Sequence, residues 1–386
     1  MNVLFVTNDH TVKNYGVTTV VSQLANEIAN RDNDIQVVIA AIGRTSVQQS
    51  ESVTIELLPS ARIGMVWNWS PNLIGRLDDI VTRYHIDLIH VHGVWAAVQW
   101  AALMIARYRK IPSIVSSHAM LEPWYWNKQG LLKKIKKKLY FHLVFQRAIT
   151  ESTIFHAITP IEKDNIHKLL PKQKIVVIPN VIGLDKENIY ENSRAIMCPE
   201  QMFLFLGRLH PVKGVDLLVN AFYQANLGSK WRLVLAGPES VPLYAKKIKM
   251  TVSNLGLSNR VEFVGPVFGA AKLELVRKAW AVVFPSYCEV VGMVNLEAAA
   301  CMVPSITTFE TGLWDWEEGG GMLIHPDVNE LANSLLRMTR WSLAERLHSG
   351  DKSLNLVANN YSWKAVVPKW EALYLTLITN HDLQSN

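Results

Sequence analysis

Two glutamates flank the start of a predicted helix in the second half of the chain. Glu289 and Glu297 stand eight residues apart, and Gly292 lies between them where a strand-like run gives way to a helical one. Glu297 stands five positions after Gly292, a rise of about 7.5 Å along a helix. A ligand across the helix start would meet both carboxylates, and the free amides of Met293 and Val294 would face its anionic part. Sugar and ribose hydroxyls suit such carboxylates, although two unrelated surface glutamates would give the same spacing.

A second group of residues follows the first strand predicted in the same half. Gly207 permits close approach of the backbone, and the cations Arg208 and Lys213 stand five residues apart where another helix begins. Two positive charges at such a turn suit a diphosphate. Surface charges that merely flank a turn are the alternative interpretation.

A lysine-rich segment in the first half has helical periodicity. Apolar residues at positions 131, 132, 135, 139 and 143 alternate with Lys133, Lys134, Lys136, Lys137 and Lys138. We expect the apolar face to pack into the first half of the chain. The lysines would then face an anionic membrane surface or a lipid-diphosphate acceptor.

The elements that must position these residues form an α/β pattern, in which short β-rich runs alternate with amphipathic stretches. Predicted strands of the first half are residues 2–7, 35–40, 53–58, 88–91, 113–116, 154–158 and 175–178, and those of the second half are 202–206, 232–236, 261–264, 281–284 and 304–308. Each half therefore predicts one doubly wound parallel sheet. Such sheets bind ligands at the carboxyl ends of their strands, so we expect two domains facing each other across a cleft.

The predicted domain boundaries follow from a polar segment that breaks this rhythm. Residues 183–200 read as a linker between a first domain, 1–182, and a second domain, 201–360. A closing helix, 361–386, is expected to cross back to the first domain.

Composition excludes several classes of protein. The chain has 386 residues, 49% of them hydrophobic, and only three cysteines, which rules out a disordered chain and a disulfide framework. The longest nearly apolar stretch, 94–106, is too short to span a membrane, and the first ten residues lack the basic start of a signal peptide. The first 182 residues carry 20 basic and 13 acidic residues. They contain no nucleic-acid recognition module, so no nucleic-acid partner is expected.

Several short motifs together resemble one family. GRLxxxKG at 207–214, AGPE at 236–239, FVGPV at 263–267 and PSxxExxGxxxxEAxA from Pro285 onward are similar to glycosyltransferase family 4, which has the GT-B fold. The segment 118–124 and the IPNV at 178–181 fit the same pattern. Within the family, the sequence is most similar to the exopolysaccharide type, including heterocyst-envelope polysaccharide transferases of cyanobacteria.

The resemblance implies a retaining, metal-independent hexosyltransferase that uses a nucleotide-diphosphate sugar and no cofactor. UDP-glucose is the first candidate donor, with other sugars and GDP left open, and a saccharide or lipid-linked molecule is the acceptor. The implied catalytic residues are His118, Arg208, Lys213 and Glu289. The implied donor-binding residues are Gly16, Gly207, Arg208, Lys213, Val267, Glu289, Val291, Gly292, Met293, Val294 and Glu297. A cytoplasmic protein, peripheral on the inner face of the membrane, is expected.

The sequence departs from the family in two motifs: it has Val290-Val291 before Gly292, where Gly-Phe is usual, and Tyr15-Gly16 in place of paired glycines. Two other functions remain open, a UDP-sugar epimerase of the same fold and a nucleotide-sugar-binding protein without turnover. A dehydrogenase is disfavoured because no GxGxxG follows a predicted strand.

Some residues of reactive type have a simpler interpretation. Residues 32–34 have a DxD form but read as a surface turn, and His90 and His92 have no third metal ligand near them in sequence. His92 fits the acceptor side or a buried structural position equally well. The tryptophans at 67, 69, 124 and 126 fit either sugar stacking or a core. No metal site is expected.

Overall fold

The structure is a computed structural model that describes residues 1–10, 16–31, 34–43, 52–59, 70–123, 131–184 and 199–385. The chain divides into two units: unit 1 is Met1–Asn180 with Val366–Asn386, and unit 2 is Val181–Ala365. Both divisions fall within a few residues of the boundaries predicted at 182 and 360. Most of the predicted linker lies outside the described residues.

Unit 1 contains a sheet of seven parallel strands in the order β3-β2-β1-β4-β5-β6-β7. The strands are β1 (Asn2–Thr7), β2 (Gln36–Ile42), β3 (Val53–Leu58), β4 (Leu88–His92), β5 (Ser113–Ser116), β6 (Thr153–Ala157) and β7 (Ile175–Val177). The helices are α1 (Val17–Arg31), α2 (Leu73–Arg83), α3 (Ala97–Arg109), α5 (Leu131–Tyr140), α6 (Gln146–Ala148), α7 (Pro160–Leu169) and α15 (Trp363–Ser385), and a π-helical turn, η1 (Phe141–Phe145), joins α5 to α6.

Unit 2 contains a sheet of six parallel strands in the order β10-β9-β8-β11-β12-β13. The strands are β8 (Met202–Leu206), β9 (Arg232–Ala236), β10 (Val261–Gly265), β11 (Ala281–Phe284), β12 (Ser305–Thr308) and β13 (Met322–Ile324). The helices are α9 (Val215–Gln224), α10 (Pro242–Asn254), α11 (Gly269–Lys278), α12 (Met293–Ala300), α13 (Val328–Thr339) and α14 (Leu343–Asn360), and Pro211–Lys213 and Phe309–Thr311 are 3₁₀ turns, η3 and η4. Strand β13 was not predicted; the other strands lie within two residues of their predicted positions.

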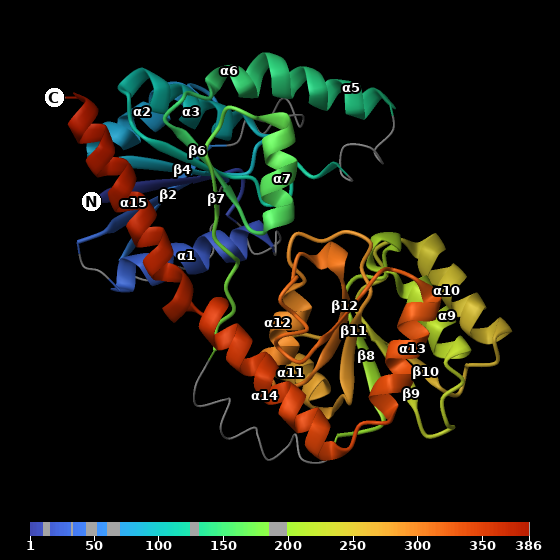
Figure 1. Cartoon of the computed structure of the whole chain (residues 1–386). Coiled ribbons are helices and arrows are strands. Elements are labelled where there is room, and N and C mark those ends of the chain that lie inside the picture. The colour runs from blue at the N-terminus through green and yellow to red at the C-terminus, as the bar shows by residue number, and fades with distance from the viewer. Residues whose placement is uncertain are drawn as a thin grey trace. The chain divides into compact units, whose positions relative to one another are not determined.

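The central strands are hydrophobic on both faces because helices cover both sides of each sheet (Figure 1). All five residues of β8, MFLFL, are buried, and so are all five of β4. In each sheet the strand order reverses at one place, between β1 and β4 in unit 1 and between β8 and β11 in unit 2. The α/β class of two doubly wound units is thus confirmed, and these reversals are where ligands bind in such sheets.

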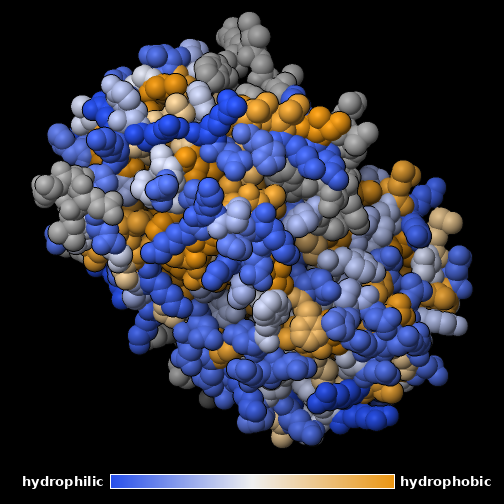
Figure 2. All heavy atoms as spheres, turned by 45° about the horizontal axis from the view of Figure 1, so that its top comes forward, coloured by the Kyte–Doolittle hydropathy of each residue, from blue (hydrophilic) through white to orange (hydrophobic). Residues whose placement is uncertain are grey.

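Helix α5 differs from the prediction in which face it buries. Ile135, Leu139 and Leu143 are 47%, 54% and 52% exposed, whereas the neighbouring Tyr140 and Phe141 are buried. These three residues of the predicted apolar stripe therefore face solvent, and Tyr140 and Phe141 anchor the segment instead. On the face that includes α5, Figure 2 shows a hydrophobic band bordered by hydrophilic atoms. No helix among the described residues is both long and apolar enough to cross a membrane.

The closing helix α15 lies along the sheet of unit 1 (Figure 1). Two of its aromatic residues, Trp370 and Tyr374, are buried there. The Trp370 ring centroid is 5.0 Å from that of His90 and 4.5 Å from that of His156, and Tyr374 is fully buried. Beneath α15, four histidines of β4, β6 and the loop after β5 come together. We call them the histidine cluster: His90, His92, His118 and His156.

A chain of hydrogen bonds runs from Tyr374 to the Ile178 carbonyl. The carbonyl end determines which atom donates in each bond. The carbonyl of Ile178 can only accept, so Nε2 of His156, 2.7 Å away, donates to it. Neutral His156 then accepts at Nδ1 from Ser116 Oγ, 2.7 Å away, and Ser116 accepts in turn from Nε2 of His90, also at 2.7 Å. Nδ1 of His90 finally accepts from the Tyr374 hydroxyl at 2.8 Å. Every link is satisfied with all the rings neutral.

Burial keeps the histidine cluster neutral. Desolvation lowers the pKa of His118 to about 3 and that of His156 to about 4, and it holds the pKa values of His90 and His92 well below the ordinary range. Burial also raises the pKa values of two carboxyl groups in the same unit. The pKa of Glu122 is raised to about 7, and that of Glu162 is raised as well.

We predict that unit 1 loses stability as the pH falls from 7.5 to 5.5. The histidines of the unfolded chain titrate near 6.5 and bind protons in this range, whereas the buried cluster stays neutral. The free energy of unfolding therefore falls by up to about 1.4 kcal/mol per pH unit for each histidine. The raised pKa values of Glu122 and Glu162 act in the opposite direction, so we expect a net loss of about 1 to 2 kcal/mol per pH unit near pH 6.5. Hydrogen exchange of the β4, β5 and β6 amides measures it, with unit 2 as internal reference. Equal protection at both pH values would contradict the prediction.

Candidate functional site

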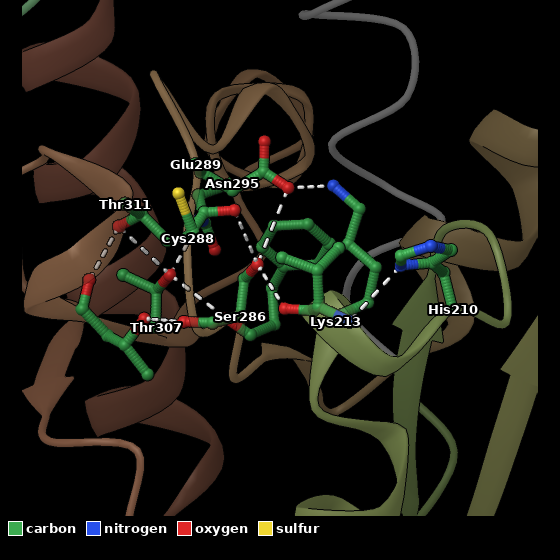
Figure 3. A network of polar contacts seen from close by, with 11 residues as sticks. His210, Lys213, Ser286, Cys288, Glu289, Asn295, Thr307 and Thr311 are labelled. Atoms are coloured by element: carbon green, nitrogen blue, oxygen red, sulfur yellow. Dashed lines mark hydrogen bonds and ion pairs between the residues drawn. The ribbon is translucent and has the colours of Figure 1, made fainter. Parts of the chain in front are cut away.

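Three of the predicted site residues, Arg208, Lys213 and Glu289, lie where the strand order of unit 2 reverses. Arg208 and Lys213 follow β8, and Glu289 follows β11, its neighbour in the sheet. Since parallel strands end at the same edge, residues far apart in sequence meet there. Figure 3 shows Lys213 and Glu289 pointing toward one another from these two segments, with Ser286 beneath them.

Gly214 lets the turn that carries Lys213 pack directly on the end of β11. Its φ is +66°, and a Cβ added there would lie 2.0 Å from the Pro285 carbonyl oxygen. Ser286 strengthens the same contact, because its buried hydroxyl donates to the Val212 carbonyl at 2.9 Å. The glycine of the motif therefore serves the placement of Lys213.

Lys213 and Glu289 form an ion pair that is largely buried, with side chains 13% and 19% exposed. Burial and the nearby Arg208 guanidinium lower the pKa of Lys213 to about 8. The adjoining Glu289 carboxylate favours the ammonium form, so Lys213 is positively charged at pH 7. Ser286 Oγ lies 3.4 Å from the same Glu289 oxygen.

Arg208 differs from Lys213 in being exposed. Within the described part of the chain its guanidinium makes no hydrogen bond or ion pair. It can therefore bind an anion without first breaking a protein contact. An anion at this position would lie between the exposed Arg208 side chain and Lys213, which is held by its ion pair with Glu289.

The start of α12 is fixed by the buried Asn295 (Figure 3). Its amide donates to Thr307 Oγ1 and accepts from Ser305 Oγ, both at 2.9 Å, and a Cβ on Gly292 would lie 2.4 Å from its nitrogen. Gly292 is thus required by packing inside the protein. Sequence reasoning missed Asn295, which is a polar residue within the buried face of a short helix.

The expectation of two free amides at this helix start is half wrong. The Met293 N–H already donates to the Val291 carbonyl at 2.9 Å, closing a tight turn. Among the described residues the Val294 N–H has no acceptor, so it is the amide that remains available to an anion. Val291 itself is buried beside this turn.

Glu297 also has a partner that the sequence did not suggest. Lys272 of α11 donates to Glu297 Oε1 at 2.8 Å, and the two side chains are 29% and 25% exposed. The two carboxylates of the predicted site thus each hold an ammonium group. Nothing in the spacing of Lys272 along α11 identifies it.

Two further predicted donor-binding residues lie at strand ends of unit 2. Val267 follows β10 and packs partly buried against the core. Gly207 directly follows β8, where its carbonyl oxygen would be 1.8 Å from a Cβ on Gly237. This contact requires glycine at position 237, and the approach of Gly207 to a ligand stays a prediction.

The remaining predicted site residues belong to unit 1. Gly16 has φ +87° immediately before α1, while its neighbour Tyr15 lies outside the described residues. His118 follows β5, and its Nε2 is 3.0 Å from Nδ1 of His92, so His92 borders the predicted site. The DxD segment at 32–34 is described only at Asp34, and the four tryptophans singled out lie outside the described residues. Nowhere in the described ranges do three or more His, Cys, Asp or Glu side chains gather as metal ligands would.

Each half of the chain matches a known protein family. Residues 15–186 match the family Glycosyltransferase Family 4, and residues 200–340 match the family Glycosyl transferases group 1. An uncharacterized glycosyltransferase of Methanocaldococcus jannaschii is 28% identical over 217 residues, which are 53% of this chain and 54% of that protein. The chain therefore spans about half the length of that relative.

Solved structures share the fold over the whole chain at low identity. Sucrose-phosphate synthase from Thermosynechococcus elongatus has a TM-score of 0.75 and 20% identity, covering 98% of this chain and 99% of that one. Anabaena HepE in complex with UDP and glucose has a TM-score of 0.71 and 16% identity, covering 97% and 100%. Two adjacent family matches and two doubly wound parallel units make this chain a glycosyltransferase of the family 4 type with the GT-B fold.

Proposed function

We propose that this chain transfers a hexosyl group from a UDP-sugar, with UDP-glucose as the first donor to test, to a hydroxyl of a saccharide or lipid-linked acceptor in polysaccharide assembly. The bond from the anomeric carbon to the diphosphate breaks, a bond to the acceptor oxygen forms, and UDP and a proton are released. In the proposal the anomeric configuration is retained and no metal is needed.

The observation that carries the proposal is the pair of cations at the strand reversal. As the diphosphate departs, negative charge grows on its oxygens, and fixed positive charge beside it stabilises the transition state more than the ground state. Lys213 is held in place by Glu289 and Gly214, and the unpaired Arg208 completes the positive charge. These side chains would supply the charge that a divalent cation supplies in other transferases.

The carboxylates divide between the two parts of the donor. Glu297 lies inside α12 and would accept the ribose hydroxyls, whereas Glu289 precedes the helix and would accept hydroxyls of the sugar. Support for a uridine donor is the solved Anabaena HepE, a structural neighbour whose complexes contain UDP and UDP-glucose. An epimerase would leave the sugar on the nucleotide, so release of UDP only with acceptor distinguishes the two reactions.

We further propose that α5 docks on an anionic membrane surface, where a lipid-linked acceptor would be found. Its exposed Ile135 and Leu139, together with Leu143 of the following turn η1, form an apolar stripe beside the exposed Lys136 and Lys138. An apolar stripe with adjacent lysines is what an interfacial helix presents to anionic lipid. Lys137 instead turns toward the protein, 5.0 Å from the Trp95 ring centre, and the Lys133 side chain lies outside the description.

We predict that Arg208→Ala lowers kcat by about 100-fold or more, the usual cost of losing one charge-stabilising group, while EDTA has little effect. UDP release from a panel of nucleotide sugars, with and without saccharide acceptors, is the measurement. Arg337→Ala, which removes an exposed arginine of α13, is the matched control and should retain full turnover. Normal turnover in Arg208→Ala, or loss of activity in EDTA that added metal restores, would contradict the proposal.

We predict that the two glutamates affect UDP binding differently. Glu297→Gln should weaken UDP by 10- to 100-fold, since charge-assisted hydrogen bonds are worth about 1.5 to 3 kcal/mol. Glu289→Gln should leave UDP affinity unchanged or raise it, because it releases Lys213 for the diphosphate. Calorimetry with UDP measures both, and Glu274→Gln, an exposed glutamate of α11, is the control. A similar loss in both variants would refute this placement of the donor.

We predict that Lys136→Gln with Lys138→Gln weakens binding to phosphatidylglycerol vesicles about tenfold or more, at about 1 kcal/mol per lysine. High salt should remove this difference, because surface charge is screened. Leu139→Ser should weaken binding at all salt concentrations. Co-sedimentation is the measurement, and Lys246→Gln with Lys247→Gln on α10 is the control. Unchanged sedimentation of both α5 variants would refute the docking surface.

A further inference from the structure

The loop after β5 holds two consecutive residues in a left-handed backbone conformation. His118 has φ +48° and Ala119 has φ +64°. For residues with a Cβ this region costs about 1 to 2 kcal/mol each, so the surrounding structure must hold the loop in place. His118 is the predicted catalytic residue of unit 1, and its ring contacts that of His92.

A buried carboxylate of α7 holds both sides of His118. Oε1 of Glu162 accepts from Ser117 Oγ at 2.5 Å and from the Ala119 N–H at 2.8 Å, and Oε2 accepts from the Ile158 N–H at 2.7 Å. Glu162 is 1% exposed. A single ionised carboxylate satisfies all three donors and ties the loop after β5 to the end of β6.

The Glu162 side chain is itself fixed by the start of α7. Its backbone N–H donates to the side chain of Thr159, the residue that caps this helix, at 3.2 Å. The Glu162 carboxylate does not bind the cap itself; it accepts from Ile158, the residue before the cap, and from the loop after β5. This placement is unusual for a glutamate near a helix N-terminus, which more often returns to the capping residue.

The second support acts on the ring of His118. Nδ1 of His92 lies 3.0 Å from Nε2 of His118, and the rings stack with centroids 5.3 Å apart. Nε2 of His92 is buried and has no partner in the described part of the chain. A buried lone pair without a donor is tolerated better than a buried N–H without an acceptor. The proton of neutral His92 is therefore on Nδ1, from which it is donated to His118.

We propose that Glu162 and His92 are positioning residues for His118. Glu162 fixes the backbone on both sides of it, and His92 occupies its Nε2, so that neutral His118 carries its proton on Nδ1 and presents an N–H donor to a hydroxyl of the donor sugar. The inference rests on the proposed function and deepens it. Neither residue needs to touch the substrate.

The first test replaces Glu162 by glutamine, which has one acceptor oxygen and one amide group. In either orientation the amide group faces at least one N–H that the carboxylate had satisfied. We expect kcat to fall 10- to 100-fold through misplacement of His118, with UDP affinity in unit 2 within twofold. Glu151→Gln, an exposed glutamate of the same unit, is the matched control and should leave both values unchanged.

A double-mutant cycle separates positioning from general damage to the fold. In a His118→Ala background, Glu162→Gln should lower kcat little further, because the ring that it positions is already absent. Losses that multiply in the double variant would overturn the proposal, as would an unchanged kcat in Glu162→Gln. Glu162→Asp keeps the charge at shorter reach and should recover part of the lost kcat.

The second test uses His92→Phe, which keeps an aromatic ring but removes the donor to His118. Because Nε2 of His92 is unpaired, a purely structural role predicts that the phenylalanine is tolerated with full activity. We expect instead retained stability, a lower kcat and a His118 ring divided between both tautomers. ¹⁵N spectra of histidine-labelled protein, assigned with His118→Gln, report the tautomer directly. A single Nδ1–H tautomer in His92→Phe would overturn the role of His92.

The two proposals fail separately. If the unaltered chain turns over no nucleotide sugar, the proposed function is wrong. The ¹⁵N spectra of the unaltered chain still decide whether His118 carries its proton on Nδ1. An Nε2–H tautomer there would overturn the positioning scheme while leaving the transferase proposal intact.

Discussion

Parallel pairing of β8 with β11 is the constraint on which the site in unit 2 depends. Strands of a parallel sheet end at one edge, and the chain leaves these two in opposite directions, toward β9 and toward β12. The segments that follow them are therefore adjacent, although they are distant in sequence. Gly214 against the Pro285 carbonyl, and Ser286 bonded to Val212, fix their separation. The placement of Lys213 beside Glu289 follows from these contacts.

Each predicted ligand-binding carboxylate is paired with a lysine in the structure. Lys213 holds Glu289, and Lys272 holds Glu297. Pairing of this kind neutralises partly buried charges that would otherwise be costly to desolvate. A donor would have to exchange these contacts for its own, so the net gain from each depends on how well its hydroxyls and phosphates replace the internal partner.

Much of the fold could be predicted from the sequence, because buried parallel strands leave continuous hydrophobic runs such as MFLFL. The three-residue β13 leaves too short a run to be recognised. The stripe of Ile135, Leu139 and Leu143 was predicted to be buried and is exposed, because a helical period shows which residues share a face and not which face the protein covers. Cation and carboxylate types singled out the candidate residues, whose role in binding stays a prediction, whereas the Lys213–Glu289 contact and the bond made by the Met293 N–H depend on tertiary geometry.

The hydrogen-bond chain from Tyr374 to the Ile178 carbonyl has a direction, and its direction restricts how these residues can vary in evolution. Each interior member accepts on one side and donates on the other. A replacement that only donates, or only accepts, leaves two like groups facing each other in a dry interior. Among relatives, changes at positions 90, 116, 156 and 374 should therefore occur in compensating sets, linking a strand of the sheet to the last helix of the chain.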